Sequence, residues 1–400
     1  MIVFFALLLA LGGTLFYRFR LGQAVNDAPQ LLPSDSQPKG SSSSTQLPST
    51  AVIVPAYNEA ENIQQCLMAT SESSNRPASE LTVWVVDDQS TDDTLTIAQL
   101  LQDSLSDPRL HILAGQSRPA GERWVGKNWA CTQAAEQTTS EYLLFIDADV
   151  KLKPGAIETA VQAAQAEQID LLSLGPAIEC GCLTEWLVQP LIISTLLLGF
   201  NFRAVNDPHS EMAFAAGPFM LFRRAAYEQI GGHRAVADQV VEDVELSRRI
   251  KFSGLKLRYL LGTQLASVRM YRSGQALWEG WTKNLYLGSQ RNLGGMATFI
   301  MLVLLVCTLP WAALVGLGVK ALLLPLTSWN WAAIALAGIT VYLHYDLRCV
   351  GGRLSKIPPR YWWLTGVGGV LVAAIAIGSI IKTETGWGWT WRGRSLKTDG

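Results

Sequence analysis

The sequence predicts an α/β domain with a mostly parallel sheet, accompanied by apolar helices long enough to cross a membrane. The domain is predicted by short apolar runs at 81–86 and 142–146, which are typical of strands buried on both faces. Helical patterns alternate with these runs, as they do in parallel sheets. The membrane helices are predicted by stretches near both ends of the chain that carry almost no charge.

Acidic residues follow both apolar runs, as Asp87-Asp88 and as Asp147-Ala148-Asp149. Open α/β sheets bind ligands at the carboxyl ends of their strands. Two carboxylates held close together repel each other, and a divalent cation shared with a substrate phosphate relieves that repulsion. A solvated turn would also explain an isolated Asp-x-Asp, so the interpretation depends on the surrounding motifs.

The composition argues against some functions. The 400 residues are 49% hydrophobic and 16% charged, and the net charge of −1 gives no reason to expect nucleic acid as a partner. The six cysteines show no metal-ligand pattern, and Cys180-Gly181-Cys182 is tighter than the usual zinc spacing. A cytoplasmic domain would keep these thiols reduced.

Residues 1–20 are predicted to form a transmembrane anchor. The apolar run precedes Arg18 and Arg20, whereas a signal peptide carries its positive charge before the run and a cleavage site after it. The positive-inside rule places the amino terminus outside and Arg18 onward in the cytoplasm. Residues 21–50 are expected to be a flexible linker, because most of this segment is rich in Ser, Pro and Gln.

The predicted α/β domain covers residues 51–290. A strand at 51–55 leads into a segment where Asn58 could cap a helix, with Glu59 and Glu61 in its first turn as the helix dipole favours. Carboxylates at the ends of strands that open onto helices describe a nucleotide crevice in a parallel sheet.

The next part of the domain contains a third strand at 110–114 and a helix that begins near Gly126-Lys127. Ser90 or Thr91 could cap the helix that follows the second strand. Lys127 at a helix start could set an amine beside a diphosphate, although an ordinary surface lysine would look the same. Walker-type and dinucleotide-binding glycine motifs are absent from the sequence, so neither function is supported.

Several later segments have two interpretations. The apolar run 187–200 is interpreted as a helix on the membrane surface, with a buried core helix as the alternative. The small residues in 214–222 allow close backbone approach to a ligand, or simply tight packing. Glu242 and Asp243 begin a basic helix, where either one could merely complement the helix dipole. Further elements are predicted as a helix at 152–166 and strands at 171–174, 257–261 and 265–268.

Residues 296–382 are predicted to form a transmembrane region with spans at about 297–317, 321–345 and 362–381. The basic loop 348–360 fits the cytoplasm. Three full spans would leave the tail, 383–400, outside, although its basic and aromatic composition suits a cytoplasmic membrane surface. A re-entrant hairpin through 366–369 would resolve this conflict.

The order in which these motifs occur resembles that of a known protein family. Pro55-Ala56-Tyr57-Asn58-Glu59, Asp87-Asp88-x-Ser90-x-Asp92, Gly126-Lys127, Asp147-Ala148-Asp149 and Glu242-Asp243 occur in succession. This succession, over about 51–284, resembles the family 2 glycosyltransferases, which are inverting, metal-dependent enzymes of the GT-A fold. The anchor, the apolar spans and Trp391-Arg392-Gly393-Arg394 resemble the membrane-bound branch, most of all the hopanoid- and carotenoid-associated bacterial enzymes.

The resemblance implies a role for each matched position. Asp147 would lie near the ribose and the metal, Asp149 would coordinate Mg²⁺ or Mn²⁺, and Asp243 would be the general base, with Glu242 beside it. The donor, a nucleotide-diphosphate sugar, would be held by these residues: Pro55, Ala56, Tyr57, Glu59, Asp88, Lys127, Asp147 and Ala148.

The expected activity is transfer of one sugar to the hydroxyl of a membrane lipid, such as a hopanoid or carotenoid, at the cytoplasmic face of the bacterial inner membrane. The Gln-x-x-Arg-Trp motif of processive relatives is absent, which favours a single transfer. His233 precedes the base and the next histidine is His344, so a third protein ligand for the metal stays open. The alternatives are transfer to polyprenyl phosphate, which needs no base, and a non-catalytic membrane scaffold.

Overall fold

The computed structural model describes residues 1–33, 47–199 and 201–395, which divide into two compact units. The sheet unit takes its described residues from 28–178 and 200–270. The helical unit takes them from 1–27, 179–199 and 271–400. The domain predicted at 51–290 therefore includes two helices of the helical unit, α6 (Leu183–Gly199) and α10 (Gly274–Gly288).

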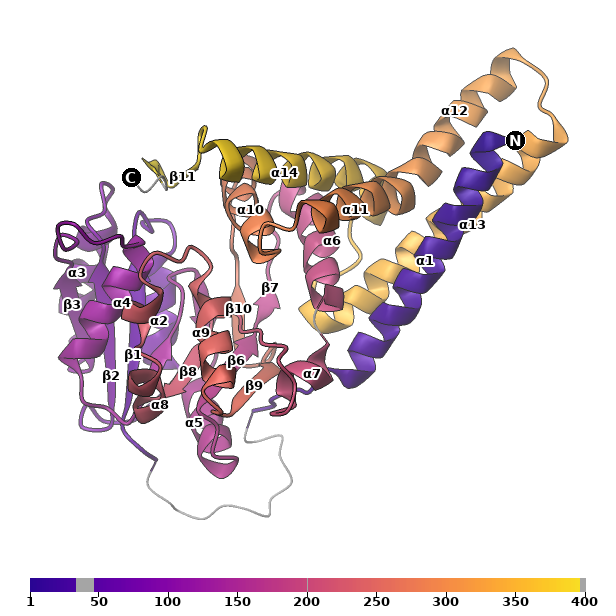
Figure 1. The fold of residues 1–400 in the computed structure, drawn as a ribbon. Coiled ribbons are helices and arrows are strands. Elements are labelled where there is room, and N and C mark those ends of the chain that lie inside the picture. Colours follow the sequence, from indigo (N-terminus) through magenta and orange to yellow (C-terminus); the bar gives the residue numbers. More distant parts are fainter. Residues whose placement is uncertain (34–46, 200, 396–400) are drawn as a thin grey trace. The chain divides into compact units, whose positions relative to one another are not determined.

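Seven strands among the described residues form the main sheet, in the order β3-β2-β1-β4-β8-β6-β9 (Figure 1). β8 is antiparallel to β4 and β6, and the other neighbouring pairs are parallel. The strands are β1 (Thr50–Ala56), β2 (Leu81–Asp87), β3 (Leu110–Ala114), β4 (Tyr142–Phe145), β6 (Leu171–Gly175), β8 (Met220–Arg223) and β9 (Leu257–Leu261). The predicted mostly parallel α/β sheet is thus present.

The pairing register brings the carboxyl ends of the central strands together. Ala56 at the end of β1 pairs with Asp87 at the end of β2, and Ile53 pairs with Phe145 at the end of β4. The side chains within these strands are almost wholly buried, because helices cover both faces of a parallel sheet. The acidic residues that follow the strands therefore meet at one edge.

Helices and a small second sheet complete the sheet unit. The helices are α2 (Ile63–Glu72), α3 (Thr94–Leu105), α4 (Gly126–Gln137), α5 (Ala156–Ala166), α7 (Phe202–Asn206), α8 (Arg224–Gln229), η2 (His233–Val236) and α9 (Glu242–Phe252). The second sheet joins β5 (Val150–Leu152), β10 (Ala266–Val268) and β7 (Ala177–Ile178). The helix predicted at 152–166 begins only at Ala156, because Leu152 pairs with Ala266 in this sheet.

Two predicted helix caps are wrong. Asn58 has a φ of 53° and lies outside α2, which begins at Ile63. Its Oδ1 instead accepts a hydrogen bond from the Thr91 backbone, N–O 2.8 Å, so these two residues join neighbouring loops. α3 begins at Thr94, whose backbone N–H donates to Asp92 Oδ1 at 3.0 Å.

The helical unit contains the apolar segments. Its further elements are α1 (Ile2–Asp27), α11 (Leu293–Val303), η3 (Leu304–Thr308), α12 (Leu309–Leu323), α13 (Ser328–Ser355), η4 (Trp362–Leu364), α14 (Thr365–Thr385), β11 (Thr390–Trp391) and β12 (Arg394–Ser395). Within the described chain, four helical stretches are long and apolar enough to cross a membrane: 2–27, 293–323, 328–355 and 362–385. α1 and α13 lie side by side (Figure 1).

Three expectations for the apolar segments need correction. α1 continues to Asp27, into the segment predicted to be a linker, of which 34–46 lie outside the described residues. The hairpin predicted at 366–369 is instead the first turn of α14. Its glycines allow close helix packing, because a Cβ on Gly368 would lie 2.5 Å from the Leu187 carbonyl oxygen. The buried alternative holds for the first half of α6, where 185–192 are buried.

The described part of the carboxyl-terminal tail folds back onto α10. Thr390 Oγ1 donates to Glu279 Oε1 at 2.7 Å, and Lys283 Nζ lies 4.0 Å from the centre of the Trp391 ring. The end of α14 and the start of the tail are thereby held beside α10, the helix that precedes the first of the carboxyl-terminal apolar segments.

Candidate active site

The loops after β1 and β2 form one continuous surface. Asp88 N donates to Ala56 O at 2.8 Å, Asn58 N donates to Ser90 Oγ at 3.0 Å, and Glu59 N donates to Thr94 Oγ1 at 2.7 Å. The predicted donor-binding positions in these two loops are therefore brought together. Of two other predicted positions, Pro55 of β1 pairs with Val86 of β2, and Ala148 is buried in the core.

Asp88 is almost fully buried at the end of β2, with 4% of its surface exposed. Arg118 Nη2 approaches its Oδ2 at 3.3 Å. Arg118 lies between β3 and α4, in a segment without periodicity, and was not among the predicted site residues. Burial beside a guanidinium holds the Asp88 carboxylate in position at the crevice.

Lys127 lies between two carboxylates. Its Nζ is 2.6 Å from Asp147 Oδ1 and 2.7 Å from Glu242 Oε1. Burial lowers the pKa of Lys127, but the two carboxylates outweigh this effect and raise the pKa well above its ordinary value. We call these three residues the lysine bridge. It joins the start of α4, the turn after β4 and the start of α9, so Lys127 is not an ordinary surface lysine.

Asp243 is held by backbone donors. Its Oδ2 accepts from Gly217 N at 2.9 Å and its Oδ1 accepts from Val244 N at 2.8 Å. Burial and the neighbouring Glu242 carboxylate raise the pKa of Asp243 to about 6, although Lys127 opposes this rise. A carboxylate with a pKa near neutrality can both ionise and accept a proton.

Gly217 supplies the space for this arrangement. A Cβ there would lie 3.2 Å from Asp243 Oδ2 and 3.4 Å from Lys127 Nζ. The small residues in 214–222 had two interpretations, close approach to a ligand or tight packing. For Gly217 the structure shows tight packing against these two charged side chains.

Asp147 and Asp149 form the turn between β4 and β5, where Val150 N donates to Asp147 O at 3.1 Å. Cys66 Sγ donates to Asp147 O at 3.8 Å, below this turn in the core. Burial raises the pKa of the Cys66 thiol, and the nearby carboxylates of Asp149, Glu59 and Asp147 raise it further. Mg²⁺ is commonly held by one or two carboxylates together with substrate phosphates and water. The two aspartates fit that pattern.

A third protein ligand is not evident. Within the described residues, no group of three or more His, Cys, Asp or Glu side chains could hold a metal ion. His233 is buried against Phe145, and its Nδ1 lies 2.9 Å from the Tyr227 hydroxyl. Burial lowers the pKa of His233 to about 3, and Lys127 lowers it further, so the side chain is a neutral core residue. Oxygen atoms of the donor and water would have to complete a metal site.

Asn128 holds in place the segment that leads into α9. Its Nδ2 donates to the carbonyl oxygens of Val236 at 2.7 Å and Gln239 at 2.9 Å, and the residue is fully buried. It thereby ties the residue after Lys127 to the segment that leads into Glu242 and Asp243. The sequence offered no motif that would have identified this asparagine.

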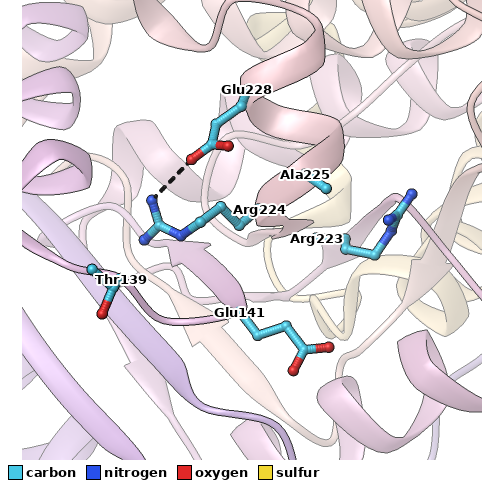
Figure 2. A pocket seen from close by; sticks show the side chains of 6 residues that line it. All are labelled: Thr139, Glu141, Arg223, Arg224, Ala225 and Glu228. Carbon is cyan, nitrogen blue, oxygen red and sulfur yellow. Dashed lines mark hydrogen bonds and ion pairs between the residues drawn. The ribbon is translucent and has the colours of Figure 1, made fainter.

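A shallow hollow of about 410 Å³ occupies a different place (Figure 2). It is lined by Thr139, Glu141, Arg223, Arg224, Ala225 and Glu228. Because Arg223 of β8 pairs with Tyr142 at the start of β4, the hollow lies at the amino end of that strand, away from Asp147. Arg224 Nη1 pairs with Glu228 Oε1 at 3.4 Å across it.

The sequence is similar to two glycosyltransferase family models and to named bacterial proteins. The family model for glycosyl transferase family 2 matches residues 51–231, and the model for glycosyl transferase family group 2 matches 142–377. The 4,4'-diaponeurosporenoate glycosyltransferase of Staphylococcus haemolyticus is 28% identical over 65% of this chain and 67% of that protein. The protein of the same name from Staphylococcus aureus (strain USA300) is 27% identical over 63% of this chain and 64% of its own length.

A solved structure shows the same fold. A mannosyltransferase from Pyrobaculum calidifontis, in complex with GDP-Man and Mn²⁺, has a TM-score of 0.54 and 19% sequence identity, and the match covers 96% of this chain and 99% of that chain. The predicted α/β fold of the GT-A type is confirmed. Since one family model covers more than half of the sequence, the chain belongs to glycosyl transferase family group 2 and is a family 2 glycosyltransferase.

Proposed function

We propose that this enzyme transfers a single sugar from a nucleotide-diphosphate sugar to the hydroxyl of an apolar membrane lipid, with Mg²⁺ or Mn²⁺ as cofactor. The observation that carries the proposal is the meeting of the lysine bridge and Asp243 where the central parallel strands end. The names of the two staphylococcal relatives support a carotenoid-like acceptor.

The joined loops after β1 and β2 would bind the nucleoside. Ala56, Tyr57 and Glu59 lie on one loop and Asp88 lies on the other, so a base and its ribose could contact both. Lys127 would contribute a positive charge next to the diphosphate. Its ammonium group already bridges two carboxylates, and a donor phosphate would compete for it.

Asp147 and Asp149 would hold the cation, which would neutralise charge on the departing diphosphate. The protein's part in the sugar transfer is then positioning and proton removal. Asp243 would accept the proton of the attacking hydroxyl while that oxygen forms its bond to the anomeric carbon, as the bond from that carbon to the diphosphate oxygen breaks. One such displacement inverts the centre, so no second carboxylate nucleophile is needed.

A second class of acceptor, an anionic lipid, is favoured by the names of the relatives. The relatives' names specify a carboxylate, diaponeurosporenoate, as the compound that is glycosylated. A carboxylate is already anionic near pH 7, as is a polyprenyl phosphate, so neither needs a base. If sugar transfer depends on Asp243, the acceptor is a hydroxyl, and if it does not, the acceptor is anionic. A non-catalytic scaffold would give no product with any acceptor.

The membrane setting is also a proposal. The apolar helices would anchor the enzyme in a bacterial inner membrane, with the sheet unit facing the cytoplasm, where nucleotide sugars are available. Arg18 and Arg20 follow the apolar part of α1, which favours this orientation.

The test is sugar transfer in membranes from a heterologous host. Wild type and Asp243→Asn would be supplied with a panel of nucleotide sugars, with and without EDTA, and the extracted lipids analysed by mass spectrometry. We expect one singly glycosylated lipid that needs a divalent cation and is absent with Asp243→Asn. A long polymer would refute single transfer. A product undiminished in Asp243→Asn would favour an anionic acceptor, and no product with either protein would favour the scaffold.

A further inference from the structure

Arg348 lies inside the helical unit, on α13, and is only 6% exposed. Arginine stays protonated at physiological pH. Ionisable residues within apolar helix bundles are energetically costly, and they usually face a partner or mark a functional site. The charge of Arg348 therefore needs a physical explanation.

One edge of the guanidinium is held by the protein. Pro190 lies inside α6 and has no N–H, so the carbonyl of Trp186, four residues earlier, receives no hydrogen bond from it within the helix. Arg348 Nη1 donates to this carbonyl oxygen at 3.2 Å. The proline thus leaves an acceptor that fixes the position of the arginine.

The other edge has no protein partner. Nε and Nη2 of Arg348 are buried, and within the described residues neither makes a hydrogen bond. These two nitrogens lie next to each other on the planar group. Such a pair of parallel N–H donors matches the two oxygens of a carboxylate or phosphate.

The surrounding side chains do not balance the charge. The ionisable groups that act on Arg348 are Cys307, Tyr17 and Cys180. Thiols and phenols are neutral near pH 7. The closest acidic residue along α13, Asp346, forms its ion pair with Arg18. A buried charge without a counter-ion is strongly disfavoured, so an external anion would stabilise this arrangement.

The sequence around Arg348 favours the approach of an anion. Residues 347–383 contain no Asp or Glu. Arg353, Lys356 and Arg360 are exposed near the carboxyl end of α13. Arg348 lies seven residues before that end, a depth of roughly 10 Å at 1.5 Å per residue. This depth suits the head of a lipid whose chain extends into the membrane.

We propose that Arg348 anchors an anion-binding site in the helical unit, which binds the carboxylate or phosphate head of a lipid through Nε and Nη2. The site goes beyond the proposed function, because it needs no sugar donor and no metal. The shared chemistry has two sources: an anionic acceptor lipid, or a phospholipid of the bilayer.

The experiment measures lipid binding to the purified full-length protein in phosphatidylcholine nanodiscs by native mass spectrometry. The probes are palmitate, phosphatidylglycerol and the neutral hexadecanol. We expect wild type to bind at least one anionic probe about tenfold or more tightly than hexadecanol, as bidentate charged hydrogen bonds allow. Arg348→Gln should lose this preference and Arg348→Lys should weaken it. The matched control, Arg20→Gln, changes an exposed arginine of α1 in the same unit and should bind as wild type does.

The lipid that the wild-type protein prefers identifies the source of the anion. Preference for palmitate alone points to a carboxylate lipid of the acceptor type, preference for phosphatidylglycerol alone points to a bilayer phospholipid, and binding of both supports a shared site. Equal binding by wild type and Arg348→Gln, or no preference of wild type for an anion, overturns the proposal. If Arg348→Gln does not fold, the wild-type and Arg348→Lys measurements still decide. Because no sugar is transferred in this assay, the proposed function can fail while the lipid site stands.

Discussion

At the scale of single residues, the environment of Asp243 determines how it can act. Burial and Glu242 favour its protonated form, whereas Lys127 and two backbone N–H groups favour its ionised form. The balance leaves a pKa of about 6, above the ordinary value of an aspartate. A proton acceptor with this pKa is mostly ionised at pH 7 and is more basic than an exposed carboxylate.

The first prediction concerns pH. With a hydroxyl acceptor, kcat/KM is expected to fall as the pH falls through about 6, because the protonated form of Asp243 cannot accept a proton. Initial rates across about pH 5 to 8 would measure this. A profile without an inflection near 6 would instead match an acceptor that is already anionic.

The Asp243→Asn variant provides the control for folding. Since the pKa of Asp243 is higher in the folded protein than in the unfolded chain, the folded state is the stronger proton binder. Ionisation of the Asp243 carboxyl therefore lowers the free energy of unfolding as the pH rises from about 4 to about 6. Asp243→Asn should lose activity yet have a Tm at pH 7 no lower than wild type. A large drop in Tm would mean that the activity loss reflects misfolding.

The second prediction concerns Gly217. A methyl group there would lie 3.2 Å from Asp243 Oδ2, which is closer than most Cβ contacts, so the carboxylate must move. Gly217→Ala is expected to lower kcat by about tenfold or more, since small displacements in an active site are costly. Gly316→Ala is the matched control, because nothing lies within 4 Å of its added Cβ. Unchanged kcat in Gly217→Ala would show that Asp243 does not need its present position.

At the scale of elements, the lysine bridge connects α4, α9 and the turn after β4. α4 and β4 are consecutive in the sequence, whereas α9 follows much later, and each contributes one charged residue at or next to its terminus. The bridge holds Glu242 and Asp147 near one ammonium group. Without that group, two carboxylates would repel each other in a partly buried site.

The third prediction is that Lys127→Met lowers the free energy of unfolding by about 2 kcal/mol and abolishes donor binding, because it leaves two partly buried carboxylates without a cation. Urea unfolding of the purified protein and titration with the nucleotide sugar would measure the two effects. The control is Arg234→Gln, which removes an exposed ion pair with Glu136 and should change stability little. Intact donor binding in Lys127→Met would exclude a role for this amine at the diphosphate.

The fourth prediction concerns the glycines of α14. Because a Cβ on Gly368 would lie 2.5 Å from the Leu187 carbonyl oxygen, Gly368→Leu should force α14 away from α6 and lower the Tm in detergent. Gly318→Leu adds the same side chain at a position with nothing within 4 Å, and should have a Tm close to that of wild type. Equal values for the two variants would contradict close packing of α14 on α6.

At the scale of the whole molecule, the contacts of the tail bear on the side of the membrane at which the chain ends. Within the part of the chain that the structure describes, no candidate span lies between β10 of the sheet unit and α10, so a cytoplasmic sheet unit would place α10 on the same side of the membrane. The tail hydrogen-bonds to Glu279 of α10. α14 also follows the exposed basic residues Arg353, Lys356 and Arg360 at the end of α13, so both ends of α14 are expected at the cytoplasmic face.

The fifth prediction is therefore that α14 lies along the membrane surface and that the chain ends in the cytoplasm. Its exposed apolar residues Val367, Val370, Ile377 and Ile381 follow helical spacing and would face the lipid. A reporter fused after residue 400 should behave as cytoplasmic, like one fused in the loop at 356. A periplasmic signal from the carboxyl-terminal reporter would mean that α14 crosses the membrane.

The sequence by itself determined the strand ends and the acidic residues that follow them. Buried strands require continuous apolar runs, and polar residues end such runs, so Asp87, Asp147 and the parallel sheet could be predicted from local pattern alone. The lengths of the apolar helices were less well predicted: α1 and α13 extend past their apolar stretches, because packing continues a helix beyond its hydrophobic part.

Only the tertiary structure decided which of these groups meet. The ion pair of Lys127 with Glu242, the support from Asn128 and the burial of Arg348 against the carbonyl freed by Pro190 join residues that are distant in the chain. Such contacts leave no periodicity, because they depend on the relative placement of elements rather than on local backbone preference. The position of a charge in the sequence indicated a strand or helix end, and its partner became known only when the chain was folded.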